Sequence, residues 1–112
     1  MKIVTAIIRP NALEVVRSAL QDAGINGMTV AEVRGFGRQK GHHALYRGAE
    51  YNVAFQPKLQ LELAVDDSRL AEVTEIIASQ AHSGRVGDGK IFIASLESVI
   101  RIRTGETGIE AI

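Results

Sequence analysis

No cysteine and no tryptophan occur among the 112 residues of this chain, and only 4% of the residues are aromatic. The absence of cysteine excludes disulfides, thiolate metal sites and a cysteine nucleophile, and it fits a reducing compartment. The 13 basic residues are balanced by 13 acidic ones, so the broad positive field of a nonspecific nucleic-acid-binding protein is missing. Because aromatic stacking residues are also scarce, we expect no direct binding to nucleic acid.

Long apolar segments are missing as well. No run approaches the ~20 residues that span a bilayer, and residues 1–10 lack the long apolar region of a signal peptide. We therefore expect a cytoplasmic protein that reaches a membrane only through a partner. The length fits a single domain over residues 1–112, which can remove roughly 65% of the unfolded chain's surface from water and needs no covalent staple.

Hydrophobic periodicity predicts four strands and two helices. The clearest strand covers residues 59–65, where four aliphatic residues alternate with Gln60, Glu62 and Ala64. The other strands are expected over residues 3–9, 27–36 and 91–96, and the helices over residues 11–24 and 66–84.

The order of these elements is strand, helix, strand, long loop, strand, helix, strand. This order predicts an α+β protein with the ferredoxin-like, or split βαβ, fold, in which an antiparallel sheet carries both helices on one face. Asn11 is expected to cap the first helix in a capping box with Glu14, and Gly24 to end it. Asp66 and the two polar residues after it are expected to cap the second helix.

The first and last strands are apolar on both faces. In the first strand, Ile3 and Ile7 point to one side, while Val4, Ala6 and Ile8 point to the other. Two helices on a single face of the sheet cannot cover both sides. We therefore expect a homo-oligomer, in which another copy of the chain covers the second face.

Residues 37–55 have neither helical nor strand periodicity, and an unpatterned connection of this length inside a compact domain is usually functional. Gln39 offers an amide oxygen that could ligate a hard cation such as Mg²⁺, and Lys58, just after the loop, could pair with a carboxylate. Tyr46 and Tyr51 could anchor a partner or accept a modification. The alternatives are a solvated polar loop and tyrosines that pack back onto the body.

Residues 83–90 form a glycine-rich turn that ends at Lys90. Glycines let backbone N–H groups approach a polyphosphate, and lysine adds a positive charge, although the spacing is not that of a Walker loop. Arg101 and Arg103 follow a period-two pattern that would place both guanidiniums on one face, as suits phosphate oxygens. The alternatives are a tight turn with a solvated lysine and a charged edge strand. Taken together, the three cations favour an anionic ligand.

Four motifs in this chain resemble those of the PII signal-transduction proteins, a family of trimeric nitrogen and energy sensors. They are Gly35-Phe-Gly-Arg-Gln-Lys-Gly41, Tyr46-Arg-Gly-Ala-Glu-Tyr51, Ser83-x-x-x-Gly87-Asp-Gly-Lys-Ile-Phe-Ile-x-x-Leu96 and Arg101-Ile-Arg-Thr-Gly-Glu106. The resemblance covers essentially the whole chain and implies a homotrimer. It makes residues 37–55 the T-loop, residues 83–90 the B-loop and residues 97–112 the C-terminal loop or strand.

The resemblance implies that ATP and ADP compete for clefts between neighbouring subunits, and that 2-oxoglutarate binds together with Mg-ATP. The residues expected to bind nucleotide are Thr29, Gly37, Arg38, Glu62, Ala64, Gly87, Asp88, Gly89, Lys90, Arg101 and Arg103. Those expected to bind 2-oxoglutarate are Gln39, Lys40, Gly41, Lys58 and Gly87, and Gln39 is also expected to coordinate Mg²⁺.

The resemblance also implies that the T-loop reports the ligand state to target proteins, such as an ammonium transporter, nitrogen-metabolism enzymes or kinases. Tyr51 corresponds to the tyrosine that a uridylyl- or adenylyltransferase modifies in many relatives, and such a modification should block docking to the transporter. The residues expected to contact a partner are Tyr46, Arg47, Glu50 and Tyr51.

The chain departs from many members of this family at positions that read the partner. These departures are His43, Ala44, Ala54 and Gln56, and they bear on the choice of target rather than on ligand chemistry. A rival function on the same scaffold is a small nucleotide or acyl-phosphate hydrolase, which the fold alone does not exclude. Because the chain has ligand-binding groups but no evident activated nucleophile, we favour a non-catalytic regulator, with which slow ATP hydrolysis would be compatible.

Overall fold

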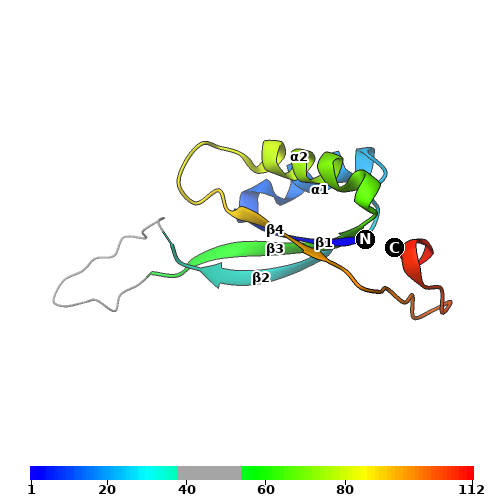
Figure 1. The fold of residues 1–112 in the computed structure, drawn as a ribbon. Coiled ribbons are helices and arrows are strands. Elements are labelled where there is room, and N and C mark those ends of the chain that lie inside the picture. Colours follow the sequence, from blue (N-terminus) through cyan, green and yellow to red (C-terminus); the bar gives the residue numbers. More distant parts are fainter. Residues whose placement is uncertain (38–53) are drawn as a thin grey trace.

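The computed structural model of the chain describes residues 1–37 and 54–112. Its strands form one antiparallel sheet in the order β2-β3-β1-β4, with two helices packed on it (Figure 1). This is the α+β, ferredoxin-like arrangement that the sequence predicts. In chain order the elements are β1 (Lys2–Ile8), η1 (Pro10–Ala12), α1 (Leu13–Asp22), β2 (Thr29–Gly35), β3 (Gln56–Val65), η3 (Asp67–Arg69), α2 (Leu70–Ala81), β4 (Lys90–Ser95) and η4 (Gly108–Ala111).

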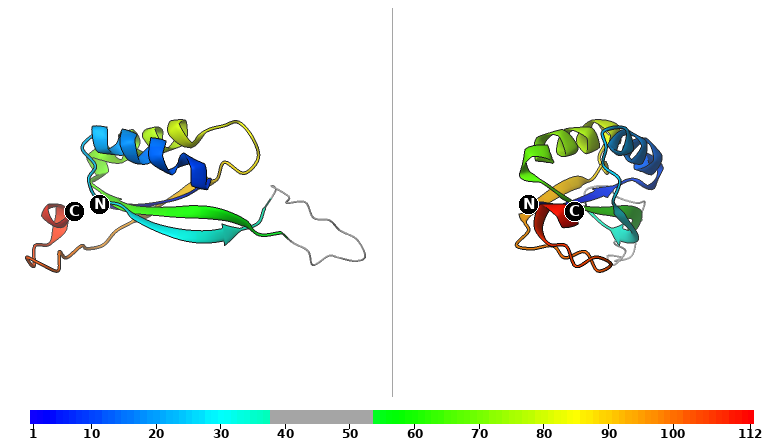
Figure 2. Two further views of the ribbon diagram at one scale, coloured as in Figure 1. Left: turned by 180° about the vertical axis from the view of Figure 1, so that it is seen from behind. Right: turned by 90° about the vertical axis from the view of Figure 1, so that its right-hand side faces the viewer.

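The hydrophobic core lies between the sheet and the two helices, which cover the same face of the sheet (Figures 1 and 2). Val4, Ala6 and Ile8 of β1 are buried there, as the alternation in that strand predicts. The aliphatic side of β3 and the apolar stripes of both helices complete the core. Their buried members are Val16, Leu20, Leu61, Leu63, Val65, Val73 and Ile77.

The other side of the sheet is called the open face here, because neither α1 nor α2 covers it (Figure 2). Residues that pair across an antiparallel ladder share a face, so the register fixes which side chains point to it. Thr5 pairs with Phe92 on one side and with Glu62 on the other. Phe92 is 52% exposed. Ile3 and Ile7 of β1 lie on the same face as Thr5, whereas Val4, Ala6 and Ile8 lie on the buried face. The prediction that the first and last strands are apolar on both faces is therefore confirmed.

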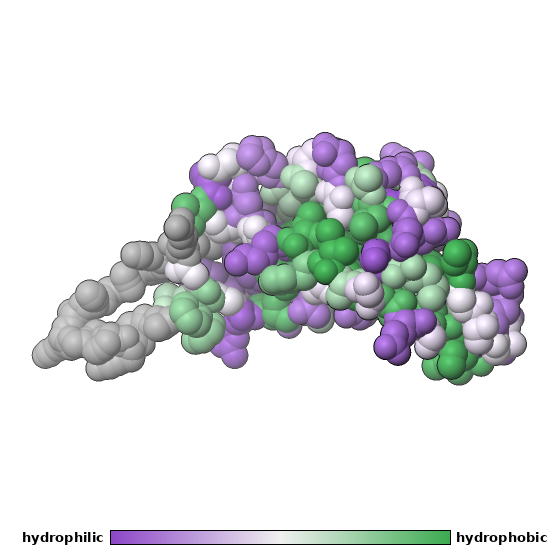
Figure 3. All heavy atoms as spheres, in the orientation of Figure 1, coloured by the Kyte–Doolittle hydropathy of each residue, from purple (hydrophilic) through white to green (hydrophobic). Residues whose placement is uncertain are grey.

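Exposed apolar side chains continue beyond the sheet into the C-terminal segment. In the space-filling view, hydrophobic residues gather along the edge below the helices and again near the C-terminal end (Figure 3). The exposed apolar side chains of β4 and the C-terminal segment include Ile93, Ile100 and Ile102, the last of which is 98% exposed. Among the helices of the described ranges, none is both long and apolar enough to cross a membrane.

The start of the first helix differs from the prediction. Asn11 does not cap it, because helical winding begins one residue earlier, as the short turn η1 with Pro10 at its first position. Proline has a fixed φ suited to a first helical position and needs no partner for the N–H that it lacks. The capping residue of α1 is Ala12, without a side-chain hydrogen bond, and Glu14 accepts from Arg17 instead. The predicted capping box is therefore wrong.

The predicted cap of the second helix is present. The Asp66 carboxylate accepts a hydrogen bond of 3.2 Å from the Ser68 N–H, at the start of the turn that leads into α2. We expect Asp66→Ala to lower the free energy of unfolding by about 1 kcal/mol, because this N–H would lose its partner. Asp66→Asn is the control, since its amide oxygen can still accept. Urea unfolding of the two variants should separate them, and equal stabilities would contradict this role of the cap.

Candidate functional site

The glycine-rich loop between α2 and β4 contains two backbone positions that require glycine. Gly87 and Gly89 have φ values of 107° and 101°, a region that other residues rarely adopt. Gly89 also lies directly against β1, and a Cβ atom built there would stand 1.7 Å from the carbonyl oxygen of Ile7. The loop is therefore pressed onto the end of the sheet in a conformation that only glycine allows.

Asp88 folds this loop back on itself. One carboxylate oxygen, Oδ2, accepts from the backbone N–H groups of Ser83 at 2.7 Å and Gly84 at 2.8 Å. The other, Oδ1, accepts from the Ser83 hydroxyl and from Arg9 Nε, the latter at 3.1 Å. The hydrogen bonds from Ser83, followed by those from Gly84 and Arg9, hold the pKa of the Asp88 carboxyl well below its usual range. Asp88 therefore remains ionised around neutral pH.

Two cations from the sheet hold carbonyl oxygens of the same loop. Arg9, which follows β1, donates from a terminal nitrogen to the Val86 carbonyl at 2.7 Å. Lys58 of β3 is only 9% exposed, and its Nζ donates to the Gly87 carbonyl at 2.6 Å. Burial, together with the nearby charge of Arg9, lowers the pKa of Lys58, while Asp88 partly offsets this effect.

Lys58 and residues 85–90 of the glycine-rich loop line a cavity of about 430 Å³, called the loop hollow here. Ile7, Gly35 and Phe36 contribute its walls from the ends of β1 and β2. The predicted ligand residues that the structure brings together in it are Gly37, Lys58, Gly87, Asp88, Gly89 and Lys90. Backbone glycines beside several cations are the donor set that suits a phosphate group.

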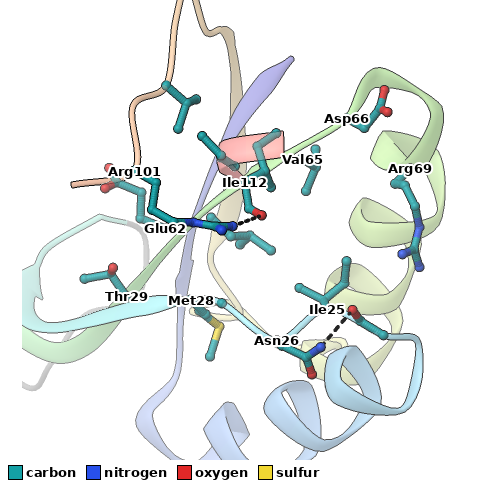
Figure 4. Close-up of a pocket in the computed structure, with 16 residues that line it drawn as sticks. Ile25, Asn26, Met28, Thr29, Glu62, Val65, Asp66, Arg69, Arg101 and Ile112 are labelled. Carbon is teal, nitrogen blue, oxygen red and sulfur yellow. Dashed lines mark hydrogen bonds between the residues drawn. The ribbon is translucent and has the colours of Figure 1, made fainter. Parts of the chain in front are cut away.

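A second cavity, of about 680 Å³, lies at the other end of β2 and is called the tail hollow here. Thr29, Glu62, Ala64 and Arg101, four of the predicted nucleotide-binding residues, line it together (Figure 4). Thr29 and Glu62 are paired in the β2–β3 ladder, which explains why residues far apart in sequence meet here. The hollow has apolar walls and contains the Glu62 carboxylate and the Thr29 hydroxyl. This combination can bind a flat heterocyclic group.

Arg101 enters the tail hollow from the C-terminal segment (Figure 4). Its guanidinium donates to Glu106 Oε1 at 2.7 Å and to the Ile112 carbonyl at 3.4 Å. The Arg101 N–H also donates to the Glu106 carbonyl at 2.8 Å. A short turn that closes at Gly105 therefore presents Arg101 to the hollow.

The period-two prediction for Arg101 and Arg103 is wrong. Residues 102–104 form a turn, and Ile100 makes only an isolated bridge to Thr107, so the two guanidiniums do not share a strand face. The cause is a tight reversal of the chain at Gly105. Its φ of 77° is readily adopted by glycine but is incompatible with a continuous strand. Arg103 is exposed and does not line the tail hollow as Arg101 does.

Both hollows border the open face. Thr29, Glu62 and Ala64 stand on that face at one end of the sheet, and Ile7 and Lys90 stand on it at the other. A family model described as Nitrogen regulatory protein P-II matches residues 1–106, which include the whole loop hollow and the tail hollow except for Ala111 and Ile112. The chain belongs to the P-II family. The resemblance of the four motifs is thereby confirmed, and the family description is that of a regulatory protein rather than of an enzyme.

Curated P-II relatives match over nearly the whole chain. Nitrogen regulatory protein GlnK of Escherichia coli (strain K12) is 59% identical over 106 residues, which cover 95% of each chain. Nitrogen regulatory protein P-II of Rhizobium meliloti (strain 1021) is 55% identical over 112 residues, and its counterpart in Azospirillum brasilense is 54% identical over the same length. The last two alignments cover 100% of both chains.

The remaining predicted site residues lie outside the described residues. They are Arg38, Gln39, Lys40, Gly41, Tyr46, Arg47, Glu50 and Tyr51, together with the departures His43 and Ala44. Sequence reasoning missed Arg9, which holds the glycine-rich loop from 77 to 79 residues away. No local pattern marks Arg9, because its partners become neighbours only when β4 pairs with β1.

Proposed function

We propose that this chain is a nitrogen-signalling regulator that binds ATP or ADP competitively and binds 2-oxoglutarate together with Mg-ATP. In this proposal it is a cytoplasmic homotrimer that changes the conformation of its T-loop with the bound ligand and so controls target proteins. The targets would be an ammonium transporter, which would place the protein at the membrane surface, or nitrogen-metabolism enzymes and kinases. Tyr51 would be the site of modification by a uridylyl- or adenylyltransferase.

The observation that carries this proposal is the division of the predicted nucleotide site into two hollows at opposite ends of one sheet. Thr29 in the tail hollow and Gly35 in the loop hollow are six residues apart on β2, a separation of roughly 20 Å at ~3.3 Å per residue. The base would occupy the tail hollow, against Thr29, Glu62 and Ala64. The phosphates would lie at Gly87, Gly89 and Lys90.

This division favours a site shared between two copies of the chain. A head-to-tail contact would set the tail hollow of one copy against the loop hollow of the next, and repeated contacts of this kind close into a ring. The open face, which borders both hollows and carries the exposed Phe92, supplies the surface for such a contact. The number of three copies comes from the P-II family resemblance.

The ligand chemistry also fits the groups that are present. Lys58 and Lys90 bring positive charge to the loop hollow, and its glycines leave room for an anion close to the backbone. In the proposed complex, Gln39 would help to coordinate Mg²⁺, while Lys58 and residues 39–41 would hold the oxoacid. The ligand would act on targets only through its different affinities for the alternative conformations of the protein.

Isothermal titration calorimetry tests this proposal. We expect ATP and ADP each to bind and to displace one another, because they would share one site. We expect 2-oxoglutarate to bind with Mg-ATP present and to lose at least about 90% of its affinity without nucleotide, which corresponds to a coupling of about 1.4 kcal/mol. A matched titration with ATP and a chelator would isolate the role of Mg²⁺. Equal 2-oxoglutarate affinity with and without nucleotide would refute the proposed mechanism, and no binding of any ligand would refute the assignment.

A further inference from the structure

We propose that Arg9 and Asp88 are positioning residues, which fix the glycine-rich loop in a conformation that binds phosphate without touching the ligand themselves. This inference rests on the proposed binding of a nucleoside polyphosphate at the loop hollow. It changes the expected role of Asp88, and it gives a role to Arg9, which stands outside the four family-like motifs.

The first reason is that the Asp88 carboxylate is already occupied. Its two oxygens accept from Ser83, Gly84 and Arg9, and its side chain is only 22% exposed. A carboxylate that faced a phosphate would repel it, whereas here both oxygens face donors of the protein, and the charge is balanced by the Arg9 guanidinium. The side chain of Asp88 therefore stabilises the conformation of the loop.

The second reason is the direction of the peptide groups. In a planar trans peptide the C=O of one residue and the N–H of the next point in opposite directions. Arg9 binds the carbonyl of Val86, so the N–H of Gly87 is turned away from Arg9. Lys58 binds the carbonyl of Gly87, so the N–H of Asp88 is turned away from Lys58. Two consecutive N–H groups are thus set in fixed directions beside the loop hollow, as an anion-binding turn requires.

The third reason is that Arg9 links two contacts in one rigid group. Its Nε reaches Asp88 and its terminal nitrogen reaches Val86, and the side chain is only 19% exposed. The planar guanidinium holds these two acceptors in a fixed relation. A lysine at this position would keep the charge but could not hold both acceptors in that geometry.

The test uses Asp88→Asn and Arg9→Lys in the full chain, with titrations of ATP, ADP and adenosine. Positioning predicts that each variant binds ATP and ADP about tenfold more weakly or worse, because the loop donors would lose their alignment. Adenosine, which lacks phosphates, should bind each variant as it binds the unmodified protein. Arg17→Lys is the matched control, since Arg17 also donates from Nε and a terminal nitrogen to a carboxylate, Glu14, but on the surface of α1.

The sign of the Asp88→Asn effect separates positioning from simple electrostatics. If Asp88 acted only by its charge, its removal would strengthen the binding of ATP, and this result would overturn the proposal. Unchanged ATP binding by Arg9→Lys, or an equal loss of ATP and adenosine binding in both variants, would also overturn it. The double variant should bind ATP no more weakly than the weaker single variant, whereas additive losses would indicate that Arg9 contacts the ligand directly.

The outcome for the unmodified protein keeps the two proposals distinguishable. If the unmodified chain binds no nucleotide, the proposed function fails, and the positioning proposal fails with it. If the unmodified chain binds ATP while both variants bind it equally well, only the positioning proposal fails. A thermal melt of each variant would show whether the fold is intact.

Ser83→Ala provides a milder change in the same cluster. This variant should weaken ATP binding in the same direction as Asp88→Asn.

Discussion

Replacing Gly89 by alanine is expected to lower the free energy of unfolding by about 3 kcal/mol or more. Two costs combine at this position. The φ of 101° is unfavourable for any residue with a Cβ atom, and the new Cβ would stand 1.7 Å from the carbonyl oxygen of Ile7. Because that oxygen belongs to backbone in β1, relief requires the loop to move away from the sheet. The movement would disturb the adjoining pair between Ile7 and Lys90, with which the β1–β4 ladder ends.

Gly105→Ala is the matched control for this prediction. Gly105 also has a positive φ, of 77°, but a Cβ built there meets nothing within 4 Å. Its substitution should therefore cost only the conformational term, about 1 kcal/mol. Urea unfolding at one fixed protein concentration would measure both variants, since the proposed assembly would make stability depend on concentration. Equal losses for Gly89→Ala and Gly105→Ala would contradict the close approach of the loop to β1.

The parts of the fold that follow from local periodicity could be predicted from the sequence. The alternation in β3 identifies the side that faces the helices, and the two apolar sides of β1 predict apolar side chains on the open face as well. The start of the first helix could not be placed from Asn11 alone. Asn11 favours a cap at its own position, whereas Pro10 favours a first helical position one residue earlier, and the structure follows Pro10. The reversal at Gly105 likewise overrides the period-two signal of Arg101 and Arg103.

The site was predictable only to the extent that its residues lie in continuous motifs. Residues 87–90 are contiguous, and the structure indeed brings them together with Lys58 in one hollow. Arg9 and its partner Asp88 are 79 residues apart, so their contact depends on the pairing of β1 with β4 and has no local signature. The separation of the expected nucleotide residues into two hollows also requires the register of β2 on β3, which residue spacing does not reveal.

Replacing Phe92 by aspartate is expected to abolish assembly of the chain. Phe92 lies on the open face, paired with Thr5, and is 52% exposed in the single chain. If another copy covers this face, the substitution removes an aromatic anchor and places an unpaired charge in an apolar contact, which costs several kcal/mol. Sedimentation velocity should then show the change from an assembly of three chains to a single chain of 12.1 kDa. ATP binding should fall with it, because neither hollow would meet its counterpart.

Val15→Asp is the matched control, since Val15 is 48% exposed but lies on α1, away from the open face. It should leave both the sedimentation coefficient and ATP binding unchanged. Circular dichroism should show intact secondary structure in both variants, because each substituted side chain is half exposed in the single chain and contributes little to its core. An unchanged mass for Phe92→Asp would place the contact between copies elsewhere. An assembly that is lost while ATP binding persists would show instead that one chain binds nucleotide alone, and the shared site would have to be abandoned.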